Sequence, residues 1–202
     1  MGNKTSHYMK FKDQINDKEK TKWWNKELRD CAHCYKIPMY NLDLPLAYRR
    51  MPQGCVDVGA NVGSFSYYAA PHFKNVYAFE AVQSTFETAR DNLQNVSNVE
   101  LYNLAAYNVD DKDVTITEHT SGLSGDSSIY ANNNNESLQS ESCKTISLEG
   151  IFDLCDIDFI DYLKVDCEGA EYDLLYNKDL SQINFMVMEL HPGYLGESKT
   201  SE

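Results

Sequence analysis

Ionisable side chains follow several apolar runs of this 202-residue chain, and their types and spacing could build one reaction site. Asp57 lies near the end of the first run, and a glycine-rich turn follows that run. Glu80 comes at the end of the second run. Lys164 lies inside a third run, and His191 ends a fourth. Carboxylate, ammonium and imidazole groups can hold a charged ligand, bind a metal ion or move a proton. A fold that gathers the ends of these runs would place all of these groups in one site.

The first group belongs to the turn 56–63, whose sequence is VDVGANVG. An apolar strand, a glycine-rich turn and a helix in succession are typical of Rossmann-like domains, where glycines let the backbone approach a ligand. Asp57 would repel the pyrophosphate of a dinucleotide, and Asn61 replaces the middle glycine of the dinucleotide motif. A cationic ligand such as S-adenosylmethionine (SAM), with its ammonium and sulfonium groups, suits Asp57 better. Taken alone, the turn could also be purely structural.

The second group is Glu80, which ends a predicted strand at 75–79 and follows Gly59 by 21 residues. Rossmann-like sites place an acid at this distance to accept hydrogen bonds from ribose hydroxyls. Ala81 and Val82 would then flank the adenine. The alternative is a strand-end carboxylate that water solvates.

The third group centres on Lys164, which shares one face of its predicted strand with Asp166 because side chains alternate along a strand. A lysine inside an apolar strand is costly unless an acid pairs with it. Asp166, or Glu189 on the neighbouring strand, is the expected partner.

The tips of the last two strands should be neighbours and would bring Asp166, Glu168, Glu189 and His191 together. Such a cluster, at the mouth of a cofactor crevice, could abstract a proton or bind a metal ion. The alternative is a buried ion pair together with acids at a helix start, Glu168 and Glu171.

Strands and helices must alternate to position these groups, and the hydrophobic periodicity predicts that they do. The predicted strands are 54–58, 75–79, 99–104, 159–166 and 184–190, with short accessory strands at 114–117 and 144–147. The predicted helices are 64–70, one opened by a capping box at 84–87, and 169–176. This order implies an α/β fold with a mainly parallel sheet, whose ligands bind at the carboxyl ends of the strands.

Two segments lie outside this alternation. Residues 1–50 are predicted to form a helical and irregular extension with a helix at 17–33, which leaves 51–202 as the SAM-binding domain. Residues 119–142 are rich in Ser, Asn and Gly and predict a long loop, such as a lid or a binding loop.

Composition excludes two classes of function. A net charge of −13 argues against nucleic-acid binding, and the sequence has no run of 18 apolar residues that could span a membrane. One pair among the six cysteines has zinc-like spacing, but no second Cys/His pair lies at a suitable distance to complete a zinc site. We therefore expect reduced thiols in a cytoplasmic, intracellular compartment.

Four motifs, VDVGANVG, YAFEA, YLKVDCEGAEYDLL and FMVMELH, occur in an order that resembles the FkbM-type SAM-dependent methyltransferases. The resemblance covers residues 54–191 and implies a class I methyltransferase fold, SAM as the donor, and O-methylation of a sugar or another hydroxyl-bearing metabolite. Carried over to matching positions, the resemblance implies a SAM site at Asp57, Gly59, Asn61, Gly63 and Glu80, and a polar cluster at the acceptor end at Lys164, Asp166, Glu168, Glu189 and His191. We add four neighbouring residues to the expected cofactor-binding set: Ala60, Ala81, Ala106 and Asp166.

Class I methyltransferases continue past the fifth strand with a helix and a strand hairpin, for which residues 192–202 are too short. The fifth strand is therefore expected to lie at a sheet edge and to expose the apolar run 185–188. We expect the N-terminal extension, a second copy in a homodimer, or neighbouring domains of a longer chain to cover that edge. The longer chain would be a glycan-building protein, for example a viral one.

The predicted reaction is SAM-dependent O-methylation of a hydroxyl on a sugar or glycan, for example a deoxyhexose such as rhamnose. His191 is the first choice for the base, since an unperturbed histidine has a pKa of about 6.5, and Asp166 is the second. Lys164 and Glu189 complete the catalytic set. Alternatively, Mg²⁺ held by Asp166, Glu168 and Glu189 could acidify the hydroxyl.

Two rival functions stay open. An NAD-dependent oxidoreductase or epimerase would use the same fold, although the glycine pattern disfavours it. A Rossmann-like interaction module that has lost its chemistry would have no reason to keep the acids at the strand tips.

Overall fold

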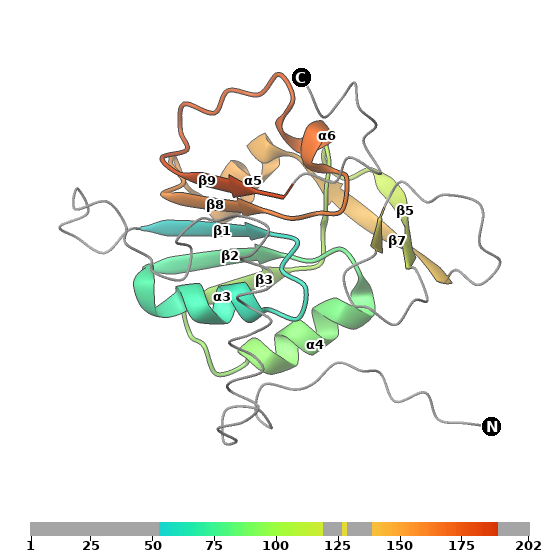
Figure 1. Cartoon of the computed structure of the whole chain (residues 1–202), viewed down its shortest axis with the longest axis horizontal. Helices are drawn as coiled ribbons and strands as arrows, with labels where there is room; N and C mark the ends of the chain where they lie inside the picture. The colour runs from blue at the N-terminus through green and yellow to red at the C-terminus, as the bar shows by residue number, and fades with distance from the viewer. Residues whose placement is uncertain (1–52, 119–126, 129–138, 190–202) are drawn as a thin grey trace. The chain divides into compact units, whose positions relative to one another are not determined.

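Two sheets and their helices make up the part of the protein that a computed structural model describes, residues 53–118, 127–128 and 139–189. The main sheet has five strands in the order β3-β2-β1-β8-β9, and every neighbouring pair is parallel. Its strands are β1 (Gly54–Val58), β2 (Asn75–Phe79), β3 (Val99–Tyr102), β8 (Tyr162–Val165) and β9 (Met186–Met188). The predicted α/β fold with a mainly parallel, Rossmann-like sheet is therefore confirmed (Figure 1).

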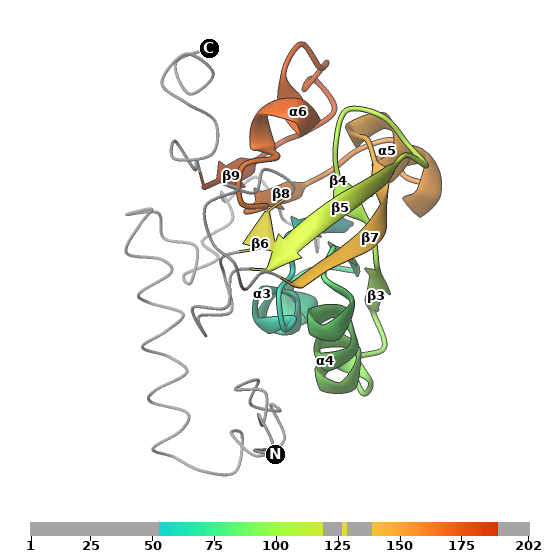
Figure 2. The ribbon, with the colours of Figure 1, turned by 90° about the vertical axis from the view of Figure 1, so that its right-hand side faces the viewer.

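Helices cover both faces of the main sheet, as Figure 2 shows. One face carries α3 (Ser64–Ala69) and α4 (Gln83–Leu93), with the short 3-10 helix Ala70–His72 between α3 and β2. The other face carries α5 (Leu148–Cys155) and α6 (Glu171–Leu175). Strands buried on both faces read as continuous apolar runs, which explains why all five residues of β1 are buried.

Alternation along the strands decides which side chains meet each helix layer. Val56, Val58, Leu163 and Val165 point toward α5 and form the main core with Ile151 of that helix. The intervening residues of β1 and β8 point the other way, toward α3. That second set includes Asp57 and Lys164, which are direct partners in the register of the two strands.

A second, smaller sheet lies at the end of the main sheet where its strands terminate (Figure 1). Its order is β4-β7-β5-β6, built from β4 (Ala105–Ala106), β5 (Asp113–Glu118), β6 (Ser127–Ser128) and β7 (Gln139–Ile146). Strands β5 and β7 pair antiparallel, whereas β4 pairs parallel with β7. A small apolar cluster beneath this sheet contains Val82, Ala105, Ile116 and Cys143.

Several predicted boundaries were wrong. Strand β3 ends at Tyr102 and β8 begins at Tyr162, so both strands are shorter than the apolar runs that contain them. Helix α6 begins at Glu171 rather than at residue 169, because Glu168 and Gly169 have φ angles of +51° and +103° and cannot be helical.

The capping box predicted at 84–87 was also wrong. Helix α4 begins at Gln83 with Val82 as its N-cap, and no side chain of the cap residue accepts a hydrogen bond. The N–H of Gln83 instead donates to the carboxylate of Glu141 on β7. A tertiary contact from the second sheet replaces the local cap, which sequence spacing alone cannot reveal.

The loop predicted at 119–142 is shorter than expected, because Ser127–Ser128 pairs with β5 and β7 already begins at Gln139. Three parts of the chain lie outside the described ranges: the other residues of that loop, the extension 1–50 with its predicted helix at 17–33, and residues 190–202. The domain boundary at residue 50 therefore stays a prediction. Among the helices of the described part, none is long and apolar enough to cross a membrane.

Candidate active site

The glycine turn after β1 is held tightly against the neighbouring strands. Gly59, Asn61 and Gly63 all have positive φ angles, of +76°, +51° and +84°. The N–H groups of Gly59 and Ala60 both donate to the carbonyl oxygen of Phe79, at 3.0 and 2.9 Å. Asparagine tolerates the left-handed region better than other side chains, and the Asn61 Oδ1 accepts a hydrogen bond from the next N–H at 2.7 Å.

Gly59 also packs directly on the backbone of the loop after β8. A Cβ atom at this position would lie 1.7 Å from the carbonyl oxygen of Asp166, which no side chain could accommodate. The turn and the Asp166 loop are therefore in contact, and neither can shift without the other.

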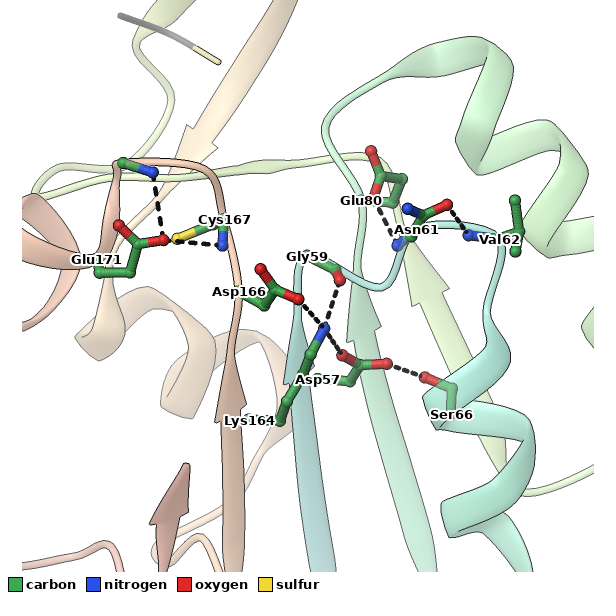
Figure 3. Close-up of polar contacts among 11 residues, drawn as sticks. Asp57, Gly59, Asn61, Val62, Ser66, Glu80, Lys164, Asp166, Cys167 and Glu171 are labelled. Carbon is green, nitrogen blue, oxygen red and sulfur yellow. Dashed lines mark hydrogen bonds and ion pairs between the residues drawn. The ribbon is translucent and has the colours of Figure 1, made fainter. Parts of the chain in front are cut away.

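An ion pair between Asp57 and Lys164 lies beneath this turn (Figure 3). The Lys164 Nζ lies 3.0 Å from Asp57 Oδ1 and donates to the Gly59 carbonyl oxygen at 2.6 Å. The Ser66 hydroxyl donates to Asp57 Oδ2 at 2.6 Å, and Asp166 Oδ2 lies 3.8 Å from the same Nζ. Asp57 is fully buried, and the Lys164 side chain is 12% exposed. One buried lysine thus links β1, the turn and the loop after β8.

The structure adds to two sequence-based interpretations of these residues. Asp166, one of the two predicted partners of Lys164, does pair with it, but at the longer distance of 3.8 Å. The main partner of Lys164 is Asp57, because β8 pairs with β1 and the register puts the two residues side by side on one face. Asp57, which was predicted to meet the ligand's ammonium, contacts Lys164 and Ser66 and helps to hold Lys164 under the turn. Its role toward a ligand stays a prediction.

Lys164 is a fixed cation in this arrangement. Burial by itself would lower the pKa of its ammonium group, but Asp57 and Asp166 outweigh burial and hold that pKa above its ordinary value. Lys164 therefore stays protonated at neutral pH, where it can donate hydrogen bonds but cannot accept a proton.

Glu80 lies at the end of β2 beside the same turn, and its side chain is almost completely buried. Its Oε2 accepts a hydrogen bond from the N–H of Asn61 at 2.8 Å, and its Oε1 accepts one from the N–H of Val82 at 2.9 Å. Burial raises the pKa of the Glu80 carboxyl to about 7 even though both hydrogen bonds favour the charged form. This carboxylate is costly to keep, and two backbone amides hold it in one orientation.

Small residues line the neighbouring backbone. Ala60, Ala105 and Ala106 are all buried, and Ala81 packs against the cluster that contains Val82. Ala106 pairs with Ile146 of β7, so the second sheet reaches the same end of the strands as Glu80. Ala81 follows Glu80 directly, Ala60 lies next to the end of β2 through its hydrogen bond to Phe79, and Ala106 belongs to the main core.

The acids of the last two strands also end at this edge of the sheet. The N–H of Asp166 donates to Val58 O at 3.0 Å, and the N–H of Glu189 donates to Val165 O at 2.9 Å. The backbones of Asp166 and Glu189 therefore follow adjacent strands, as predicted. The Asp166 side chain is 30% exposed, so a ligand at the strand tips can reach it.

A buried glutamate shapes the loop that carries Asp166. The Oε1 of Glu171, a residue that is 1% exposed, accepts hydrogen bonds from the N–H groups of Cys167 and Gly169, both at 3.2 Å (Figure 3). The two hydrogen bonds span the bend in which Glu168 and Gly169 have positive φ angles. Sequence reasoning treated Glu171 only as a helix-start acid, and it did not single out Ser66 or Asn103.

The alternative metal site is not assembled. Within residues 53–118, 127–128 and 139–189, no three His, Cys, Asp or Glu side chains lie close enough together to hold a metal ion. Asp166, Glu168 and Glu189, all within these described residues, are therefore not gathered into the Mg²⁺ site that the sequence offered. His191 lies outside the described residues.

A match to the methyltransferase FkbM domain covers residues 57–200 and so includes the turn, Glu80 and the strands that carry Lys164, Asp166 and Glu189. The chain belongs to the FkbM methyltransferase family. Family membership confirms the resemblance that the four motifs indicated and points to a methyltransferase. No curated protein sequence matches the chain.

Solved structures with a similar fold include the methyltransferase FkbM of Methylobacillus flagellatus, with 16% sequence identity and a TM-score of 0.41. The alignment covers 67% of this chain and 32% of that one. A precorrin 8w decarboxylase of Methanobacterium thermoautotrophicum shares 18% identity at a TM-score of 0.37, over 68% of this chain and 53% of that one. The chain thus spans about a third to a half of the length of these structures, and its place in the FkbM family rests on the domain match.

Two features of the strand tips decide which ligand this FkbM-family chain can bind there. Glu80 and the turn offer an orienting carboxylate and closely approaching backbone to a nucleoside-like ligand. The three acids Asp57, Glu80 and Asp166 surround one cation, Lys164, so the site carries an excess of negative charge when Glu80 is ionised. Such a site favours a positively charged ligand over a phosphate.

Proposed function

We propose that this protein is a SAM-dependent O-methyltransferase that acts on a hydroxyl group of a sugar or glycan. The observation that carries the proposal is Glu80, a buried carboxylate that two backbone amides hold beside the turn 59–63. Burying such a group has a cost, and the cost is understandable if the carboxylate orients a pair of ribose hydroxyls.

The charge of the site supports SAM over a dinucleotide. The carboxylates of Asp57, Glu80 and Asp166 near Lys164 would repel a pyrophosphate, and Asn61 adds a side chain where a dinucleotide motif has a glycine. A sulfonium carries positive charge and is attracted instead. Bound SAM would supply an electrophilic methyl group attached to that sulfur.

The chain's own residues would then orient the acceptor and remove its proton. An acceptor hydroxyl has to lie about 3 Å from the methyl carbon and in line with the departing sulfur. His191 is the proposed base, and a general base of this kind contributes about 10²–10⁴-fold to the rate. Asp166, partly exposed at the tip of β8, is the second candidate for that proton.

The sugar or glycan acceptor is inferred from the family resemblance and from the site's need for a hydroxyl nucleophile. A deoxyhexose such as rhamnose is a suitable first substrate to test. A homodimer, or neighbouring domains of a longer chain, would supply further acceptor contacts, since acceptor selectivity resides in loops and adjoining surfaces.

Incubation with SAM and methyl rhamnoside, or a panel of other hexosides, should yield a product that is heavier by one methyl group in mass spectrometry.

His191→Ala should lower the methylation rate by about 10²-fold or more while SAM still binds, if His191 is the base. Full activity in both His191→Ala and Asp166→Asn would remove both residues from the chemical step. Stabilisation of the protein by NAD but not by SAM in a thermal shift would favour the oxidoreductase, and stabilisation by neither would favour the inactive module.

A further inference from the structure

Asn103 follows β3 directly and reaches across to the end of β2. Its side-chain Nδ2 donates to two successive carbonyl oxygens, that of Glu80 at 2.9 Å and that of Ala81 at 3.0 Å. The side chain is partly buried, so these hydrogen bonds are shielded from water on one side. One primary amide thus ties down the peptide groups on either side of Ala81.

The N–H group and the carboxylate of Glu80 are hydrogen-bonded as well. Its N–H donates to the carbonyl oxygen of Tyr102 at 3.0 Å, and its two carboxylate oxygens accept the N–H groups of Asn61 and Val82. The partners of these groups are all backbone atoms, whereas the Glu80 carbonyl oxygen accepts its hydrogen bond from the side chain of Asn103. The Val82 N–H and the Ala81 carbonyl belong to the same peptide group, so the group that Asn103 holds is also the one that donates to the Glu80 carboxylate.

We propose that Asn103 is a positioning residue for cofactor binding, which fixes the backbone 80–82 so that the Glu80 carboxylate faces the ribose. This inference rests on the proposed function, because it concerns how well the site binds SAM. Asparagine suits the role because its –NH₂ group carries two hydrogens that can reach two carbonyl oxygens. An aspartate there has no proton to donate at neutral pH and would repel both carbonyls.

The chain contains a matched control for this tether. Asn98, which precedes β3, also donates from Nδ2 to two carbonyl oxygens, those of Ala70 at 2.8 Å and Phe73 at 3.0 Å. Asn98 is likewise partly buried, but it lies at the opposite end of the parallel strands from the turn. Substituting either asparagine removes two side-chain hydrogen bonds to backbone carbonyls, but only the bonds of Asn103 reach the backbone of Glu80.

The test is calorimetric titration of SAM into the wild-type chain, Asn103→Ala and Asn98→Ala. We expect Asn103→Ala to weaken SAM binding by about tenfold, since two hydrogen bonds that orient Glu80 are lost, and Asn98→Ala to change it by less than about twofold. Melting temperatures of the two variants should fall by similar amounts, which separates positioning from general destabilisation.

A double-mutant cycle with Glu80 shows whether Asn103 acts through that residue. In the Glu80→Ala background, the additional Asn103→Ala change should have an effect below about twofold, because no carboxylate remains to be oriented. An undiminished effect there, or equal losses of affinity in Asn103→Ala and Asn98→Ala, would overturn the proposal.

A measurement without ligand keeps this inference separate from the proposed function. If the wild type binds no SAM, the proposed function fails, yet the tether can still be tested by amide hydrogen exchange. The Val82 amide should exchange about tenfold faster in Asn103→Ala than in Asn98→Ala, because its hydrogen bond to Glu80 is loosened. Equal exchange rates of Val82 in the two variants would show that Asn103 does not position Glu80.

Discussion

Replacing Lys164 by Met should lower the free energy of unfolding by about 3–5 kcal/mol, the usual cost of leaving a buried charge without its partner. Asp57 is fully buried, and Lys164 is the cation beside it at 3.0 Å. The substitution also removes the donor to the Gly59 carbonyl oxygen, so the turn should loosen at the same time. Urea unfolding at neutral pH, followed by circular dichroism, measures the loss.

A surface lysine provides the control. Lys144 pairs with Asp113 at 2.9 Å, a distance close to that of the buried pair, but the two side chains are 49% and 69% exposed. Lys144→Met should therefore cost no more than about 1 kcal/mol. The double variant Lys164→Met with Asp57→Asn should recover part of the loss, because the buried charge is then gone as well. Similar losses for the two single lysine variants would show that the Asp57–Lys164 pair does not support the fold.

The second large effect is a pH dependence that comes from Glu80. Burial raises the pKa of this carboxyl from an ordinary 4.5 to about 7, with Lys164 lowering it and Asp57 raising it to a smaller extent. The folded protein therefore holds the proton more tightly than the unfolded chain does. The resulting stabilisation is complete below about pH 4.5 and is lost as the pH rises through about 7, a change of roughly 3 kcal/mol.

Comparison with Glu80→Gln isolates this contribution. From about pH 5 to about pH 8, the unfolding free energy of the wild type should fall relative to that of Glu80→Gln by about 2–3 kcal/mol. The control is Glu149→Gln on the exposed face of α5, because the hydrogen bond from Lys178 lowers the pKa of Glu149 below its ordinary 4.5. The stability that this shift contributes is already present above about pH 4.5, so Glu149→Gln should differ from the wild type by a nearly constant amount between about pH 5 and about pH 8. A difference between wild type and Glu80→Gln that stays constant with pH would contradict the burial of an ionisable Glu80.

The same proton should compete with the ligand. Ribose hydroxyls donate to the charged carboxylate, so SAM affinity should be constant above about pH 7.5 and fall by up to about tenfold per pH unit below 7. Because Glu80→Gln has no proton to gain at this position, its weaker binding should not show that dependence.

The sequence predicted the order of the elements and the edge of the sheet where the site lies. Alternating apolar runs located β1, β2, β8 and β9. Because parallel strands end at one edge of a sheet, these runs alone were enough to place Glu80 and Asp166 near the turn. The family motifs added the identity of the residues, which periodicity alone does not carry.

Contacts between distant segments could not be predicted in the same way. The partner of Lys164 depends on strand order, and the sequence does not reveal that β8 lies between β1 and β9. The Glu141 contact with Gln83 depends on where the second sheet docks, and the Asn103 tether depends on how β3 lies beside β2. Each involves residues at least 20 positions apart whose own local sequence satisfies no rule of capping or pairing.

The measurement that tests the central claim most directly is a calorimetric titration of SAM into the wild type and Glu80→Ala at about pH 8, where Glu80 is ionised. We predict one SAM molecule bound per wild-type chain and binding that is weaker by about 1–3 kcal/mol in Glu80→Ala, the cost of losing charge-assisted hydrogen bonds. No heat of binding with the wild type, or the same affinity in both proteins, would contradict a SAM site built on Glu80.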